Sequence, residues 1–97
     1  MREIPLAREE KLVVNDLFDE AIVYDQVRHR ICYLDPRTAF VWRHCNGQTA
    51  AQRIAKLLED EFHVISGEDS LMSSLTQLER LNLLKKPIVK RAKAHAA

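Results

Sequence analysis

Few side chains in this 97-residue chain are suited to metal binding or nucleophilic catalysis. The candidates are His29, Cys32, His44, Cys45, His63 and His95. No CxxC, HxxxH or HExxH spacing joins them, and the adjacent His44 and Cys45 point in different directions on a helix. The two glycines, Gly47 and Gly67, belong to no phosphate-binding loop. We therefore expect no metal site, no cofactor and no catalytic activity, and we expect both cysteines to be free thiols.

A short apolar strand at 30–34 begins the most informative stretch of the chain. Asp35 and Pro36 end this strand and start a helix, because aspartate can cap helical amides and proline suits the first helical position. The helix is expected to run to about Cys45. Asn46-Gly47 then stops it, since glycine tolerates the left-handed conformation that often ends a helix.

Two further helices follow. Thr49 is expected to cap the second one, because its hydroxyl can accept a backbone amide. The apolar face of that helix consists of Ala51, Ile54, Ala55, Leu58 and Phe62. The third helix is expected over 68–82, with acidic residues in its first turn, where the helix dipole favours them. Its apolar face is Leu71, Leu75 and Leu78, and Leu83-Leu84 closes the core.

Two strands, at 11–17 and 21–24, precede these elements. With the strand at 30–34 and short turns they predict a three-stranded antiparallel meander. The fold class is therefore α+β and winged-helix-like, with the sheet followed by three helices. The second and third strands are apolar on both faces, whereas a small antiparallel sheet usually packs only one. We expect the chain's own helices to cover the second face, with another subunit or a ligand as the alternative.

Charge is distributed unevenly along the chain. Residues 84–97 carry five Lys or Arg and no acid, which leaves residues 1–83 at −4 within a net charge of +1. We expect a flexible arm at 1–10, a folded domain at 11–85 and a basic tail at 86–97. A mildly acidic domain is a poor nucleic-acid binder. No apolar run approaches the roughly 18–20 residues that span a membrane, and no signal peptide is recognised, so we expect a cytoplasmic protein.

A helix-turn-helix arrangement is also compatible with the segment 49–55 and the helix at 68–82. A recognition helix presents Arg, Lys, Asn or Gln to the bases. The helix at 68–82 instead carries more acidic than basic residues. A winged-helix regulator of transcription is therefore the weaker alternative.

Six short motifs occur in a set order along the chain. They are Tyr24-Asp25, Tyr33-Leu34-Asp35-Pro36, Ala39-Phe40-Val41-Trp42, Cys45-Asn46-Gly47-Gln48-Thr49, Ile54-Ala55, and Leu75, Leu78 and Leu83-Leu84. Their order and spacing over about residues 8–85 resemble the PqqD family. These are the small peptide chaperones of pyrroloquinoline quinone biosynthesis and their relatives, the RiPP recognition elements. The family often has Leu-Asn where Leu34-Asp35 stands and Asp-Gly where Asn46-Gly47 stands, and both exchanges keep a capping or turn-forming residue.

The resemblance implies a non-catalytic adaptor that binds the leader of a ribosomally made precursor peptide. The leader adds as a strand beside the third strand, in the groove toward the third helix. The adaptor then presents it to a modifying enzyme, which in pyrroloquinoline quinone synthesis is a radical S-adenosylmethionine enzyme. The peptide-binding residues implied here are Arg30, Ile31, Cys32, Tyr33, Leu34, Met72, Leu75, Thr76 and Glu79.

Elementary strand chemistry supports this reading independently of the resemblance. An uncovered strand edge offers unpaired N–H and C=O groups, and strand addition uses them. The edge can also be covered by the arm at 1–10 or by a second copy. A structural subunit that forms a homodimer is therefore a further alternative.

Overall fold

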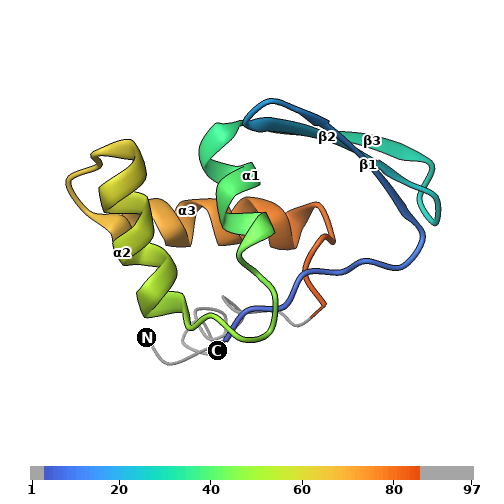
Figure 1. The fold of residues 1–97 in the computed structure, drawn as a ribbon. Helices are drawn as coiled ribbons and strands as arrows, with labels where there is room; N and C mark the ends of the chain where they lie inside the picture. Colours follow the sequence, from blue (N-terminus) through green and yellow to red (C-terminus); the bar gives the residue numbers. More distant parts are fainter. Residues whose placement is uncertain (1–3, 86–97) are drawn as a thin grey trace.

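The computed structural model describes residues 4–85, which form a three-stranded antiparallel sheet followed by three helices (Figure 1). The strands are β1 (Leu12–Leu17), β2 (Glu20–Asp25) and β3 (Arg30–Leu34), and the helices are α1 (Pro36–Arg43), α2 (Ala51–Phe62) and α3 (Gly67–Arg80). The predicted fold class is confirmed. The sheet order is β1-β2-β3, so β1 and β3 are its two edges. The expected basic tail at 86–97 lies outside the described residues.

Two turns set the register of the sheet. Phe18 and Asp19 join β1 to β2, with Leu17 opposite Glu20, and Phe18 has a φ of 57°. A positive φ is what the preferred two-residue hairpin turns require, because their twist then matches that of the strands. The second turn spans residues 26–29 and sets Asp25 opposite Arg30. Side chains alternate between two faces, an inner face toward the helices and an outer face away from them.

Helix α1 begins as predicted and ends early. Asp35 Oδ1 accepts a hydrogen bond from the Thr38 amide at 2.9 Å, and Pro36 is the first helical residue. The helix ends at Arg43 rather than near Cys45. The Cys45 amide bonds three residues back, to the Trp42 carbonyl at 3.1 Å, and such tight bonds are frequent at helix ends.

The predicted cap of α2 is wrong. Ala50 occupies the N-cap position and makes no side-chain hydrogen bond. Asn46 Oδ1 instead accepts the amides of Gln48 at 2.8 Å and Thr49 at 2.9 Å. Asparagine commonly bonds to amides two residues further along, so the polar side chain shapes the turn rather than the helix start.

Helix α3 begins one residue before the expected bound and ends two residues before it. Ser66 Oγ caps it by accepting the Asp69 amide at 3.2 Å. Gly67, the first helical residue, packs so closely on α2 that an added Cβ would lie 2.0 Å from the Ala55 carbonyl oxygen. Glycine is therefore needed at this position by the approach of α2 to α3.

One hydrophobic core joins the inner face of the sheet to the three helices. Its buried members are Ala21, Val23, Cys32, Leu34, Ala39, Val41, Trp42, Cys45, Ala51, Ile54, Ala55, Leu58, Leu71, Leu75, Leu78 and Leu83. The predicted apolar faces of the second and third helices belong to it, with Phe62 packed at its margin. Trp42 Nε1 also donates to the Leu83 carbonyl at 3.0 Å, which ties α1 to the segment after α3.

The segment before β1 is bound to the domain, which differs from the flexible arm expected at 1–10. The Ala7 amide donates to the Cys45 carbonyl at 2.7 Å, and the Arg8 amide donates to the Leu83 carbonyl at 2.9 Å. The Lys85 amide donates a hydrogen bond to the Leu6 carbonyl at 2.8 Å. These bonds satisfy backbone groups of three separate segments, so residues 6–8 are part of the folded unit.

A buried carboxylate fastens the same segment to the sheet. Asp25 is fully buried, and its two carboxylate oxygens lie 3.1 and 3.0 Å from the guanidinium nitrogens of Arg8. The amides of Val27 and Arg28 donate to Asp25 as well, at 3.0 and 3.3 Å. Each carboxylate oxygen therefore has partners, as burial of a charge requires.

The outer face of the sheet is exposed among the described residues. Ile31 is 71% exposed, Tyr33 53% and Val13 51%. The described helices lie on the inner side of the sheet (Figure 1). The expectation that the chain's helices cover both faces is therefore wrong for the described part. The three helices pack on the inner face of the sheet and on one another.

Candidate functional site

Strand β3 is an edge strand, and the register shows which of its backbone groups face outward. The Gln26 amide donates to the Lys11 carbonyl at 2.9 Å, so this pair, just beyond the ends of β1 and β2, is hydrogen-bonded. In an antiparallel ladder, bonded pairs alternate with non-bonded ones. The β2 residues that bond to β3 are then Ala21, Val23 and Asp25, and their partners are Leu34, Cys32 and Arg30. The N–H and C=O groups of Ile31 and Tyr33 consequently point away from the sheet.

The two edges of the sheet differ in protection. On β1, Asp16 bonds to Arg43 Nη2 at 2.8 Å, which places a charged pair at that edge. Charges on an edge strand are a usual means of discouraging further strand pairing. On β3 the one charged side chain is Arg30, and its Nη2 is turned to the Leu81 carbonyl at 2.7 Å. β3 is thus the less protected edge.

Helix α3 is connected to the ends of β3 by side chains and does not cover the strand's edge. Arg30 Nη2 donates to the Leu81 carbonyl at 2.7 Å, just after the end of α3, and Thr38 Oγ1 on α1 lies 3.5 Å from Ser74 Oγ in the middle of α3. No Cα atom of β3 lies within 8 Å of a Cα atom of α3, whereas paired strands lie about 4.8 Å apart. The β3 edge is therefore not paired or closely covered by α3.

A polar hollow continues this space beyond the end of β3. Its lining comes from the start of α1 and from α3, and consists of Asp35, Arg37, Thr38, Asp69, Ser70, Ser73, Ser74 and Gln77. Ser70, Ser73 and Gln77 were not predicted as site residues. The signal for them was the polar stripe that they form with Ser74 on the third helix, three and four residues apart.

The predicted site residues on β3 divide into two sets. Ile31 and Tyr33 are exposed, and their backbone groups form the free edge. Cys32 and Leu34 are 3% and 0% exposed, so their side chains belong to the core. Arg30 is half-buried and connects β3 to the end of α3.

The predicted site residues on α3 are not brought to β3. Leu75 is fully buried in the core. Ser74 contacts Thr38 near the end of β3, and at about 100° per residue Met72 and Glu79 lie roughly 160° and 140° around the helix from it. Met72 and Thr76 are half-buried and line a neighbouring hollow, which shares Ser73 and Gln77 with the first. The apolar spacing could not reveal this, because it marks the buried face and not the side that faces the strand.

The cysteines and histidines form no metal-binding cluster in the described part of the chain. Within residues 4–85, no three His, Cys, Asp or Glu side chains come together to hold a metal ion. Both cysteines are free and buried. Cys45 Sγ donates to the Val41 carbonyl at 3.1 Å, and burial raises the pKa of the Cys45 thiol to about 12. Such a thiol is not a nucleophile at neutral pH.

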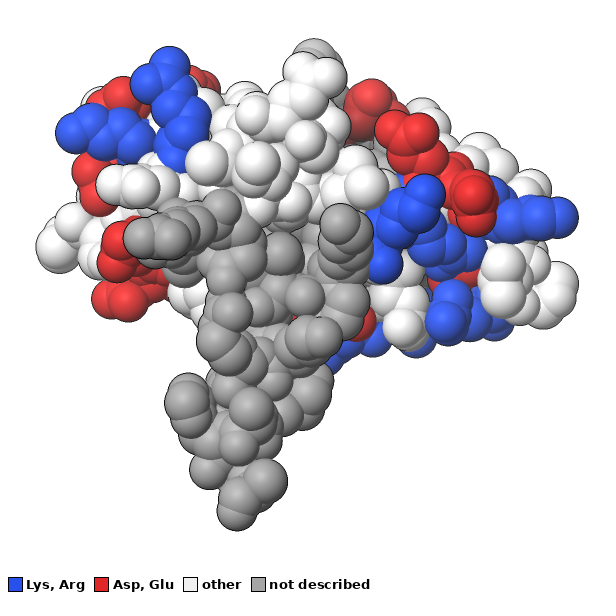
Figure 2. Space-filling view, turned by 90° about the horizontal axis from the view of Figure 1, so that it is seen from below, with Lys and Arg blue, Asp and Glu red and all other residues white. Residues whose placement is uncertain are grey.

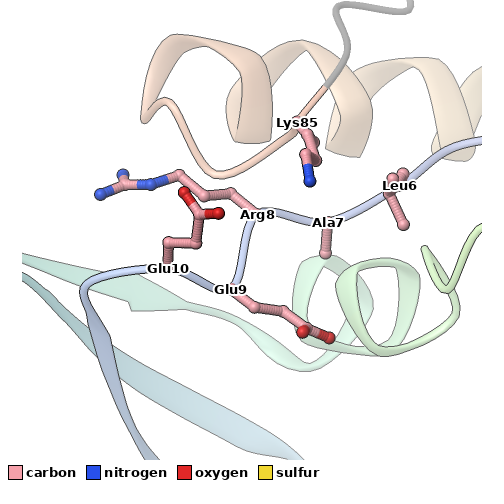
Figure 3. Close-up of a pocket in the computed structure, with 6 residues that line it drawn as sticks. All are labelled: Leu6, Ala7, Arg8, Glu9, Glu10 and Lys85. Carbon is pink, nitrogen blue, oxygen red and sulfur yellow. The ribbon is translucent and has the colours of Figure 1, made fainter.

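A second hollow lies between the segment before β1 and Lys85, which follows α3 in the chain, and Figure 3 shows its lining. Leu6, Ala7, Arg8, Glu9, Glu10 and Lys85 surround it. The Arg8 side chain extends away from Lys85 (Figure 3), and its guanidinium forms an ion pair with Asp25. The lining contains no Ser, Cys, Thr or His, and we assign no role to this hollow.

Charge is mixed on the described surface. Figure 2 shows Lys and Arg beside Asp and Glu on both sides of the view, separated by uncharged residues. The exposed residues of α3 include Glu68, Asp69 and Arg80. Nucleic-acid binders usually present a basic stripe on one element, and α3 presents none.

Comparison with known proteins finds no family model, no curated protein and no solved structure that matches this chain. Among the described residues, no helix has the length and apolar character needed to cross a membrane. Function is therefore argued from the edge of the sheet and its surroundings.

Proposed function

We propose that the protein is a non-catalytic peptide-binding adaptor. It binds the leader segment of a ribosomally made precursor peptide as an added strand on β3 and presents the peptide to a modifying enzyme, such as a radical S-adenosylmethionine enzyme. The observation that carries the proposal is the unprotected β3 edge, where Ile31 and Tyr33 direct their amides and carbonyls outward and no Cα atom of α3 lies within 8 Å. The motif resemblance points in the same direction.

The edge supplies enough interaction for a reversible complex. Two outward residues, Ile31 and Tyr33, offer four backbone groups, and each hydrogen bond stabilises by about 0.5–1.5 kcal/mol net. Their exposed side chains add apolar contact with alternate residues of the peptide. Ordering a flexible peptide costs several kcal/mol, so we expect a dissociation constant on the order of nanomolar to micromolar.

The proposal places the protein in the cytoplasm, where precursor peptides are made. Two free cysteines are compatible with a reducing compartment. A winged-helix regulator is less well supported, because α3 carries acids where base-reading side chains are needed. Pairing of β3 with a second copy uses the same edge and is one outcome of the test below.

The test uses one proline on each edge of the sheet. Tyr33→Pro removes an outward amide from β3, and Val14→Pro removes the corresponding outward amide from β1. Proline is tolerated on edge strands where the lost amide faces solvent, so both variants should fold. Tyr33→Val keeps the amide and changes the side chain alone. Peptides synthesised from short reading frames beside the gene are titrated into isotopically labelled protein, and amide shifts are followed.

We expect shifts in β3 and in residues 70–77, with binding at least about tenfold weaker in Tyr33→Pro than in Val14→Pro. Tyr33→Val should weaken binding less than Tyr33→Pro. Shifts confined to β1, or equal loss in both proline variants, would rule out strand addition on β3. A ligand-free protein that sediments as a dimer and becomes monomeric in Tyr33→Pro would assign the edge to a second copy instead.

A further inference from the structure

Carboxylates lie at the Leu34 end of β3, on the side where β2 pairs with it. Leu34 lies opposite Ala21, which places the preceding Glu20 beside Asp35. Partial burial, together with the carboxylates of Glu20, Asp35 and Asp19, raises the pKa of Tyr33 above its usual value. Tyr33 lies opposite Ile22 and directly before Leu34, so its exposed phenol belongs to the same end of the strand as Glu20 and Asp35.

The hollow beside this end is acidic as well. Asp35 and Asp69 line it from α1 and α3, with Arg37 as the base among its lining residues. Arg43, a base on the following turn of α1, is occupied elsewhere. It donates to Asp16 at 2.8 Å and to the Glu20 carbonyl at 3.1 Å. A cation that arrives at this end meets more carboxylates than bases.

The Arg30 end of β3 has the opposite character. Arg28, His29 and Arg30 follow one another at the turn that leads into the strand. Asp25, the carboxylate beside them, is fully buried and is already bonded by Arg8 and Arg28. Arg30 Nε is buried and has no hydrogen-bond partner among the described residues. Arg28 is exposed and Arg30 is half-buried, so this end is positively charged, while its neighbouring carboxylate is buried and paired.

We propose that the β3 edge selects peptides by the order of their charges. In an antiparallel complex, the preferred segment carries a basic residue opposite Asp35, apolar residues opposite Tyr33 and Ile31, and an acidic residue near Arg30. This inference rests on the proposed function and adds a sequence class and a direction to it. Asp35 and Arg30 are five residues apart, which is about 17 Å on a strand that rises about 3.3 Å per residue. That exceeds the Debye length of about 8 Å, so each end acts on its own.

The test compares two blocked heptapeptides of identical composition. The first is Lys-Thr-Val-Thr-Val-Thr-Glu, and the second exchanges its Lys and Glu. Each carries a nitroxide at its N-terminus, which broadens the amide signals of nearby residues. The protein is studied as the full chain, as Asp69→Lys, and as the matched control Asp60→Lys on α2, which makes the same charge change at a residue that does not line the hollow beside Asp35.

We expect the first peptide to bind with its nitroxide beside Asp35 and Ser70, because its lysine then lies at the acidic end. The exchanged peptide should bind about tenfold more weakly at low salt or turn round, with its nitroxide beside Arg30. Both results follow from charge order, and both differences should shrink as salt is added. Asp69→Lys should reduce the preference severalfold, and Asp60→Lys should leave it unchanged.

Equal affinity and equal orientation of the two peptides would overturn the charge-order inference while leaving strand addition intact. Binding of neither peptide, with no shift in β3, would overturn both the inference and the proposed function. Orientation is read from the wild-type protein, so the result does not depend on the folding of either variant.

Discussion

Gly67→Ala is the substitution with the sharpest structural consequence. In an isolated helix this change stabilises by about 1 kcal/mol, since glycine is a poor helix former. Here the added Cβ would lie 2.0 Å from the Ala55 carbonyl oxygen, 2.7 Å from the Ala55 carbonyl carbon and 2.9 Å from Glu59 Cγ. Ordinary van der Waals contact is 3.4–4 Å, so the backbones of α2 and α3 must separate by more than about 1 Å.

The size of the destabilisation depends on which atoms the added Cβ contacts. Overpacking a core costs about 1–3 kcal/mol, and contact with backbone lies at the upper end because a helix cannot rotate out of the way. After the favourable propensity is subtracted, Gly67→Ala should lower the free energy of unfolding by about 2 kcal/mol. For a domain of this size, that is a fall in the midpoint of thermal unfolding of about 8–16 °C.

The assay is urea denaturation followed by far-ultraviolet circular dichroism, with the slope m compared between variants. Ser73→Ala, at an exposed position of the same helix, is the control and should change stability by less than about 0.5 kcal/mol. Adding Glu59→Ala removes the flexible contact at 2.9 Å and leaves the backbone contact at 2.0 Å, so it should not restore stability. A Gly67→Ala protein as stable as the wild type would refute the close approach of the two helices.

Three further predictions concern charge and thiol chemistry. The Arg8 hydrogen bonds hold the pKa of Asp25 well below its usual value of 3.8, so its contribution to stability is present above about pH 4 and is lost as the pH falls through the lower native pKa. Asp25→Asn should therefore be less stable at pH 7 and converge with the wild type in acid, and parallel denaturation curves at both pH values would contradict this. Cys45, with its pKa raised to about 12, should resist alkylation by iodoacetamide at pH 8 in the native protein and react in urea; rapid native labelling would count against the burial. A chain truncated after Leu84 loses the basic residues and should not retain duplex DNA on a filter, whereas the full chain should show only salt-dependent retention; sequence-specific retention by the truncated chain would revive the regulator hypothesis.

The elements of the fold were largely predictable because their signals are local. The apolar run at 30–34 and the Asp35-Pro36 pair specify a strand end and a helix start within a few residues, and both appear as expected. The apolar faces of α2 and α3 depend on spacing alone, and they are buried. The prediction of the α2 cap was wrong for a local reason as well. The Asn46 side chain accepts the amides of Gln48 and Thr49, and this local bonding shapes the turn before α2.

Tertiary structure decided the properties that make a site. The sequence of a strand does not determine which of its residues direct their N–H and C=O groups toward the neighbouring strand. Only the register with β2 shows that those of Ile31 and Tyr33 point outward. The side of α3 that faces β3 depends on how the helix seats on α1 and α2, which places Ser74 near Thr38 and turns Met72 away. The Arg8–Asp25 bond, between residues seventeen positions apart, binds a segment that sequence alone made a free arm. Each of these features depends on the relative placement of elements distant in the chain, whereas periodicity and capping report only on neighbours.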